Sequence, residues 1–290
     1  MASKILGTID VSKYEVSPDT SYLTGVVRFP EEYDEFGQGY WKNLSLYNAS
    51  GDASDTQYRE AKKCIPTTHA MRCPGIQKLL SENFKFENLK MVRARSLLDG
   101  MVIPHKDFVE LDRSSSYFRV FVPLEDNPES FHSDEAGVFQ MKAGEVWFLD
   151  AGINHAAINF GGGSRMFLCL GYIFKGEFSR EDIFNPDATI GAARQSFHVR
   201  RTPLRAEAIE TIISATSKIL NQHTFKDMVF ALSKYHFIYD LPVTACYDWL
   251  ITAAEATKNN LLVCKAKSLR SYLTESRGIG ERYIINDWRP

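Results

Sequence analysis

The spacing of apolar and polar residues changes twice along the chain. Residues 1–60 mix short apolar runs with aromatic and acidic clusters. From about residue 88 to 175 the period is that of β-strands, and after about residue 200 it is helical. The pattern therefore predicts a β core over residues 1–200, including N-terminal lid elements, and a C-terminal helical domain over residues 201–290.

The middle of the chain contains several runs with the length and composition of strands, separated by turn signals such as Glu125–Pro128 and Gly161–Ser164. Short strands at this spacing with no helices between them favour an antiparallel sandwich or barrel of the jelly-roll type. We therefore predict a mainly β fold with added helices, whose core is a double-stranded β-helix as in cupins. The predicted strands are Met91–Ser96, Gly100–Pro104, Tyr117–Val122, Val138–Met141, Glu145–Leu149 and Met166–Tyr172.

Outside this region the pattern predicts a lid and several helices. The acidic and aromatic stretch Glu31–Phe36, with Tyr40 and Trp41, is predicted to form a surface edge or lid rather than a core element. Apolar residues at helical spacing predict a short helix over residues 75–85. The helical tail is predicted to begin near Pro203 and to continue with helices over residues 224–236, 243–257 and 259–276.

Composition narrows the class of protein. The 290 residues include 34 Lys and Arg against 36 Asp and Glu, and this balance argues against binding to nucleic acid or to anionic membranes. The five cysteines include no C-x-x-C pair, so we expect reduced thiols and a cytoplasmic location. No apolar run is long enough for a membrane span. A homodimer is compatible with the strand edges and the helical tail, although no heptad pattern argues for one.

Candidate chemistry centres on two histidines and one aspartate. His105 and Asp107 form an H-x-D motif at the end of an apolar strand pattern, and His155 follows another strand 50 residues later. Two imidazoles and one carboxylate make the facial triad of non-haem Fe(II) oxygenases, which leaves three adjacent coordination positions for a chelating cosubstrate and O2. A second H-x-D begins at His132, but it lies in a turn-rich acidic segment without a supporting strand pattern, so we do not predict His132 to be a metal ligand.

Arg165 follows His155 by ten residues, at the start of the next strand pattern. If the chelating cosubstrate is 2-oxoglutarate, its far carboxylate must meet a cation, and the planar guanidinium of arginine suits that bidentate role. A solvated arginine after a glycine-rich turn is the alternative.

The residues also resemble those of a known family. Matching stretches occur along nearly the whole chain, helical tail included, and they resemble the bacterial iron(II)/2-oxoglutarate-dependent free amino-acid hydroxylases of the proline 3-hydroxylase type, within the wider aspartyl/asparaginyl β-hydroxylase-like group. They are Lys4–Gly7, Glu31–Phe36, Asn48–Asp52, Val102–Asp112, Gly144–Ala151, His155, Arg165, Leu232–His236 and Tyr247–Leu250.

The resemblance implies a jelly-roll core with a helical domain, iron at His105, Asp107 and His155, and 2-oxoglutarate held at Arg165. It also places Arg95 and Arg119 among the strand arginines that face the pocket, where they are expected to hold a carboxylate of the substrate or of 2-oxoglutarate. An arginine within an apolar strand needs such a polar environment. A structural ion pair with a nearby acid is the alternative for both.

The expected function is hydroxylation of a free L-amino acid at an unactivated carbon, giving succinate and CO2. L-Proline or an analogue is the first choice of substrate. A linear amino acid such as L-lysine is the second, with the acidic lid or the acidic segment 125–135 at its far end. Two alternatives remain: hydroxylation of a peptidyl side chain that docks on the helical tail, and a non-catalytic cupin-like binding module in which His105 and His155 are structural.

Overall fold

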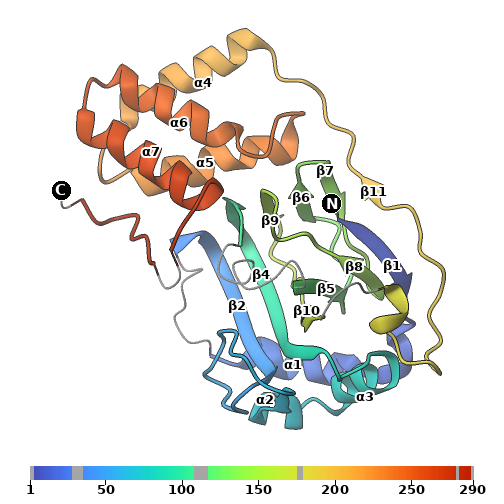
Figure 1. Cartoon of the computed structure of the whole chain (residues 1–290). Helices are drawn as coiled ribbons and strands as arrows, with labels where there is room; N and C mark the ends of the chain where they lie inside the picture. The colour runs from blue at the N-terminus through green and yellow to red at the C-terminus, as the bar shows by residue number, and fades with distance from the viewer. Residues whose placement is uncertain (1–2, 28–34, 108–116, 175–178, 279–280, 289–290) are drawn as a thin grey trace.

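The computed structural model describes residues 3–27, 35–107, 117–174, 179–278 and 281–288. The described strands form a single curled antiparallel sheet, and four C-terminal helices lie together at one side of it (Figure 1). The strands are β1 (Lys4–Thr8), β2 (Gly37–Asn48), β3 (Ile65–Pro66), β4 (Leu89–His105), β5 (Tyr117–Pro123), β6 (Ser130–Asp134), β7 (Gly137–Gln140), β8 (Glu145–Phe148), β9 (His155–Asn159), β10 (Phe167–Ile173) and β11 (Phe197–His198).

Helices occur before, between and after the strands, and 3₁₀ turns lie at Val11–Tyr14 and Arg180–Asp182. The α-helices are α1 (Val16–Gly25), α2 (Thr68–Met71), α3 (Pro74–Asn83), α4 (Ala206–Ile219), α5 (Phe225–Ile238), α6 (Ala245–Ala256) and α7 (Asn260–Thr274). Within the described residues, no helix combines the length and the apolar character that a bilayer crossing requires. The prediction of a β core followed by helices is confirmed, whereas the double-stranded β-helix assignment and the domain boundary at residue 200 stay predictions.

Strand β4 is the element that curls the sheet. The strand order is β1-β8-β5-β10-β4-β9-β6-β7-β11, with β2 paired to β4 off this path. Along one edge, the first half of β4 pairs with β10 and its second half pairs with β9. Because the two neighbours follow one another along the same edge, the sheet divides there into two walls. The space between these walls contains the candidate site.

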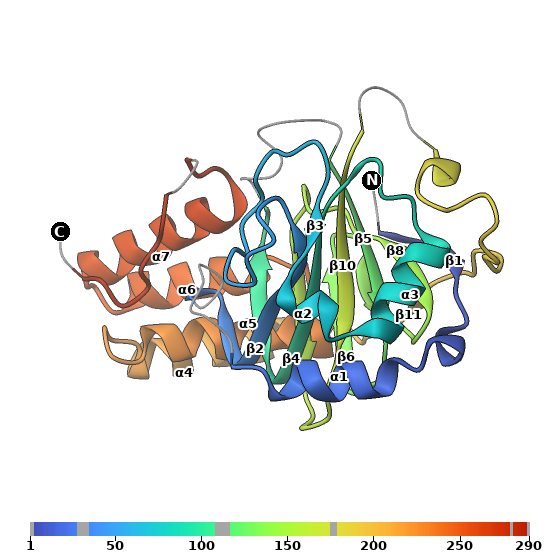
Figure 2. The ribbon, with the colours of Figure 1, turned by 90° about the horizontal axis from the view of Figure 1, so that it is seen from below.

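The outer face of one wall packs against α1 and α3, which Figure 2 shows lying alongside the sheet. Strand residues alternate between the two faces, so apolar residues of β4 and β5 such as Val92, Ala94 and Val120 face this core. Arg93, Arg95 and Arg119, which alternate with these residues, are buried, and Arg95 and Arg119 line the pocket between the walls. The alternation predicted for Met91–Ser96 is therefore present in the structure.

The C-terminal helices share a second apolar cluster with the sheet. Leu97 and Ile103 of β4 and Ile158 of β9 belong to the same cluster as Phe230 of α5 and Leu250 of α6. This core is continuous from sheet to helices, so the helical part is packed against the strand that carries His105.

Two sequence predictions about β2 and β4 are wrong. Tyr40 and Trp41, predicted to belong to a surface edge or lid, lie in the long strand β2, where Tyr40 is exposed but Trp41 is buried. Residues 31–34 of that predicted lid lie outside the described residues. The predicted strands 91–96 and 100–104 are one strand of 17 residues, because the turn-like Asp99–Gly100 step is absorbed as a bulge. There Asp99 has φ 39°, and a side chain at Gly100 would collide with the carbonyl oxygen of Gln38.

One segment after β10 reaches both ends of the strand order. Gly191 forms an antiparallel bridge with Thr8 of β1, where a side chain on Gly191 would collide with the Thr8 hydroxyl. Six residues later the same segment forms β11, which pairs with β7. We call residues 188–199 the strap; it runs along the outside of the sheet in Figure 1.

Candidate active site

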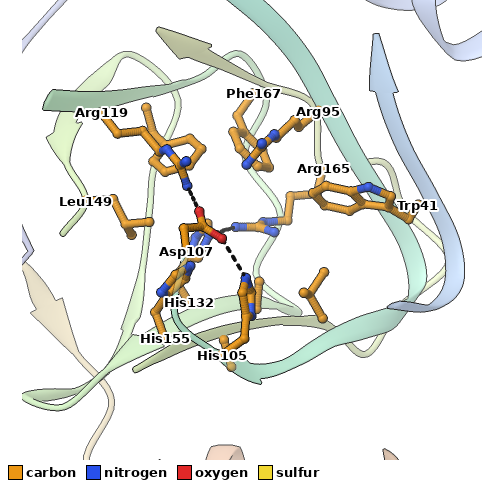
Figure 3. A pocket seen from close by; sticks show the side chains of 14 residues that line it. Trp41, Arg95, His105, Asp107, Arg119, His132, Leu149, His155, Arg165 and Phe167 are labelled. Atoms are coloured by element: carbon orange, nitrogen blue, oxygen red, sulfur yellow. Dashed lines mark hydrogen bonds and ion pairs between the residues drawn. The ribbon is translucent and has the colours of Figure 1, made fainter. Parts of the chain in front are cut away.

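A pocket of about 410 Å³, including space open to solvent, lies between the two walls of the sheet. Its lining brings together all six site residues predicted from the sequence (Figure 3). They are His105, Asp107, His155, Arg165, Arg95 and Arg119, and the remaining lining residues are Trp41, Val102, Phe121, His132, Leu149, Ala156, Ala157 and Phe167.

His105 and His155 are cross-strand neighbours. His105 ends β4 and His155 begins β9, the two residues are paired in the ladder, and their ring centroids are 4.4 Å apart. In each ring Nδ1 donates to the carbonyl oxygen two residues earlier, that of Ile103 at 2.8 Å and that of Ile153 at 2.9 Å. A carbonyl can only accept, so Nδ1 carries the proton and Nε2 keeps its lone pair for a metal.

Asp107 completes the cluster from the loop that follows β4. Its backbone N–H donates to the carbonyl oxygen of Ala151 at 2.9 Å, and its Oδ1 lies 3.4 Å from Nε2 of His105. One ligand atom from each of His105, Asp107 and His155 lies within 4.8 Å of the others, and all three residues are buried. Two imidazole nitrogens and one carboxylate oxygen at this spacing suit an Fe(II) ion, so the residues present fit the predicted metal.

The electrostatics of the cluster suit a cation. Burial alone would raise the pKa of Asp107, but the ion pair with the Arg119 guanidinium holds it well below its ordinary value. Burial and the neighbouring His105 lower the pKa of His155 to about 3. At neutral pH Asp107 is therefore an anion and His155 is neutral, which are the forms that bind metal.

Arg165 lies at the other end of the pocket, just before β10. Its guanidinium stacks 4.7 Å from the ring centroid of Phe167, and its Nη2 contacts both ring nitrogens of His132, at 3.0 Å for Nε2. Nη1 of Arg165 is buried and makes no hydrogen bond to any described residue. Burial lowers the pKa of Arg165 to about 9, so this buried side chain is still a cation at neutral pH.

Arg95 and Arg119 occupy different positions in the pocket. Arg95 donates from Nε to Oδ1 of Asn43 at 3.2 Å and lies 5.7 Å over the Trp41 ring. Arg119 makes the ion pair with Asp107 that was the alternative prediction for it. A substrate-binding role for either residue stays a prediction.

The sequence analysis missed His132 as a pocket residue. It lies on β6, where it is buried and contacts Arg165, rather than in an exposed loop. Burial and the Arg165 charge hold its pKa well below the ordinary value, so it is a neutral acceptor. The run Ser130–Asp134 has one apolar residue, Phe131, and no alternation of apolar and polar residues, so no local signal indicated that it forms a buried strand. Trp41 was missed for a similar reason, since the lid prediction placed it at the surface.

Comparisons with known proteins identify the family of this chain. The family model for aspartyl/asparaginyl beta-hydroxylase matches residues 21–173, and that for the C-terminal part of L-proline 3-hydroxylase matches residues 180–281. The curated L-proline cis-3-hydroxylase 2 of Streptomyces sp is 40% identical over 292 residues, which covers 99% of this chain and 100% of that protein. This chain belongs to the L-proline 3-hydroxylase family.

More distant relatives extend the comparison. The curated L-proline cis-4-hydroxylase of Rhizobium meliloti (strain 1021) is 26% identical over 288 residues, covering 97% of this chain and 99% of that protein. A solved structure of a viral collagen prolyl hydroxylase from Paramecium bursaria Chlorella virus-1 aligns with a TM-score of 0.35 and 10% identity, over 59% of this chain and 95% of that chain. This level of similarity is too low to carry an argument about the site.

Membership of the L-proline 3-hydroxylase family confirms the predicted resemblance. The chain is an enzyme, an amino-acid hydroxylase of the dioxygenase class. The prediction of a non-catalytic binding module is therefore wrong.

Proposed function

We propose that this enzyme hydroxylates free L-proline, or a close analogue, with Fe(II), 2-oxoglutarate and O2, and releases succinate and CO2. The observation that carries the proposal is the placement, in one pocket, of three metal-ligand residues and a buried arginine that pairs with no carboxylate among the described residues. The substrate class comes from the relatives, two of which are named L-proline cis-3-hydroxylases and match the chain over its whole length.

Nε2 of His105, the carboxylate of Asp107 and Nε2 of His155 would hold the iron. Bound there, Fe(II) with 2-oxoglutarate would supply the activation of O2 that attack on an unactivated C–H bond requires. The chain's own part is to fix the ligand atoms: each imidazole is held by a carbonyl oxygen two residues earlier, and Asp107 by Ala151 and Arg119.

Arg165 receives the far carboxylate of 2-oxoglutarate. A buried cation without an anionic partner is costly, and an incoming carboxylate relieves that cost with a charge-assisted hydrogen bond to Nη1. His132 and Phe167 orient the guanidinium, because Nη2 contacts the His132 ring and the cation stacks on Phe167.

Arg95 is the proposed clamp for the substrate carboxylate, whereas Arg119, the other arginine predicted for that role, is assigned to holding Asp107, with which it is paired. The apolar side chains of Trp41, Val102 and Leu149 line the same pocket and would enclose a small ring while excluding water. Among the described lining residues, Asp107 is the one carboxylate, and the proposal assigns it to the metal. A far-end acid for a linear cationic substrate such as lysine is therefore not present among them, so proline is preferred.

The test combines metal, cosubstrate and substrate. Anaerobic titration with Fe(II) and 2-oxoglutarate is followed by O2 and a panel of all free amino acids, with products read by mass spectrometry. We expect one hydroxyproline for each succinate when L-proline is present. A panel without amino-acid-dependent succinate contradicts the proposal, and activity on prolyl peptides alone transfers it to a peptidyl substrate. His105→Ala should abolish turnover, whereas the matched control His198→Ala changes an exposed histidine and should not.

A further inference from the structure

The backbone around His105 lies where the sheet ladder is interrupted. Between β4 and β9, Val102 pairs with Ala157 and the next pair is His105 with His155, so β4 contains one residue more than β9 in this interval. Such a bulge re-aims the side chains next to it but gives up ladder hydrogen bonds. Pro104 lies within the bulge and has no backbone N–H to donate, which is where proline is tolerated in a strand.

Two C-terminal helices provide hydrogen-bond partners for the backbone where the β4–β9 ladder is interrupted. The hydroxyl of Tyr247, on α6, donates to the carbonyl oxygen of Pro104, and the Tyr247 side chain is completely buried. The carbonyl oxygen of Leu273, in the last turn of α7, accepts from the backbone N–H of Lys106 at 2.9 Å. Carbonyls in a last helical turn have no partner within their own helix, so Leu273 is free to hold another segment. The two bonds flank His105 on either side.

A third contact continues the same arrangement. The backbone N–H of Ile103 donates to the carbonyl oxygen of Phe36 at 3.0 Å. The Phe36 ring stacks with the His105 imidazole at 6.2 Å between centroids and contacts the ring of Tyr272 on α7 at 5.9 Å. The segment from Ile103 to Lys106 is thus held by α6, by α7 and by a residue that packs on α7.

We infer that helices α6 and α7 position the metal-binding segment, and that Tyr247 is a positioning residue acting on His105 through the backbone of Pro104. The inference rests on the proposed metal site and assigns a role to the helical part of the chain. Metal ligands must be held to within about half an ångström, and bulge backbone without ladder partners does not provide that alone. Partners outside the ligand sphere typically change metal affinity by about 10- to 100-fold when they are removed.

The decisive variant is Tyr247→Phe, which removes the hydroxyl and keeps the ring in its apolar surroundings. The matched control is Tyr283→Phe, which removes a hydroxyl that donates to the carbonyl oxygen of Lys265 on α7 and makes no hydrogen bond to the H-x-D segment. Full-length proteins are titrated with Co(II) under anaerobic conditions, and the visible Co(II) absorption is recorded.

We expect Tyr247→Phe to bind Co(II) about 10-fold more weakly and with an altered absorption spectrum, while Tyr283→Phe matches the wild type. Wild-type affinity and spectrum in Tyr247→Phe overturn the inference and leave the proposed function standing. Absence of Co(II) binding by the wild type overturns the proposed metal site together with this inference.

Hydrogen exchange on the wild type keeps the inference testable if Tyr247→Phe fails to fold. Co(II) binding fixes the H-x-D segment, so peptides that contain Tyr247 and Leu273 should exchange more slowly in its presence, along with the peptide that covers residues 101–107. Protection confined to sheet peptides overturns the inference.

Discussion

Two arginines buried in the same pocket differ in what they face. Arg119 points at the carboxylate of Asp107, whereas Arg165, at the other end, faces the neutral ring of His132 (Figure 3). Both side chains are almost completely buried. The charge of Arg119 is balanced by an anion of the protein itself, but that of Arg165 is not balanced by the groups it contacts. Within one cavity, the first arrangement fixes a metal ligand and the second leaves a cation available for an incoming anion.

Removing the anion at the Arg119 end should have the largest effect. Asp107→Ala deletes a proposed metal ligand and leaves the Arg119 charge buried without it, so Co(II) binding and hydroxylation should both be lost. The metal-free variant should also be less stable by about 3–5 kcal/mol, as for other broken buried ion pairs. Urea unfolding measures this change. A free energy of unfolding equal to that of the wild type would mean that other groups balance Arg119.

Replacing each arginine in turn by a neutral residue distinguishes the roles of the two ends of the pocket. Arg119→Met leaves Asp107 uncompensated and should cost about 3–5 kcal/mol of stability, whereas Arg165→Met removes an unbalanced charge and should cost little or none. Arg165→Met should instead raise the KM for 2-oxoglutarate by about 100-fold, the value of one or two charge-assisted hydrogen bonds. Equal losses of stability in the two variants would contradict the comparison.

Acidification tests the neutral partner of Arg165. Burial holds the pKa of His132 well below its ordinary value and lowers that of His155 to about 3. In the metal-free protein, protons then bind the unfolded chain but not the folded one as pH falls below about 6.5, the ordinary value for histidine. The contribution of these two neutral histidines to the free energy of unfolding is fully present above that pH and decreases progressively as the pH falls below it.

The expected loss is about 1 kcal/mol for each of these histidines between pH 6.5 and 5.5. Urea midpoints of the metal-free protein at the two pH values provide the measurement. Replacing His132 by Phe should flatten the pH dependence, whereas replacing the exposed His198 by Gln should not. An unchanged slope in His132→Phe would show that His132 is not a neutral buried group.

The smaller of the two expected effects on the KM for 2-oxoglutarate concerns the ring beside Arg165. Phe167→Leu keeps an apolar side chain but removes the aromatic face 4.7 Å from the guanidinium. A desolvated cation–π contact is worth about 1–2 kcal/mol, so the KM for 2-oxoglutarate should rise by about 5- to 30-fold, less than for Arg165→Met. A KM unchanged from the wild type would mean that Phe167 does not help to orient Arg165 and that His132 alone does so.

Local signals in the sequence predicted the central chemistry. His105, Asp107, His155 and Arg165 each adjoin a strand pattern, and the structure brings them into one pocket. The predicted helices near the C-terminus correspond to α4–α7 within a few residues. These predictions succeeded because strand and helix periods are local properties of the chain.

The sequence did not predict which distant segment each of the buried pocket residues packs against. Trp41 and His132 lie in segments whose acidic or turn-rich neighbours look exposed, and only pairing with β4 and β9 buries them. The hydroxyl of Tyr247 meets the carbonyl of Pro104 across 143 positions of sequence, a contact for which no local pattern exists. Packing of distant segments decided these cases.

The strap has a consequence for assembly of the chain during synthesis. Without β11, the strand order ends at β1 and β7, and residues 188–199 pair with both of these strands, through Gly191 with Thr8 and through β11 with β7. Open strand edges are templates for aggregation, and here both are covered by residues that follow every strand of the main sheet except β11. A nascent chain that stops before residue 190 therefore exposes both edges at once, so we expect ribosome-stalled or truncated products to depend on chaperones until the strap emerges.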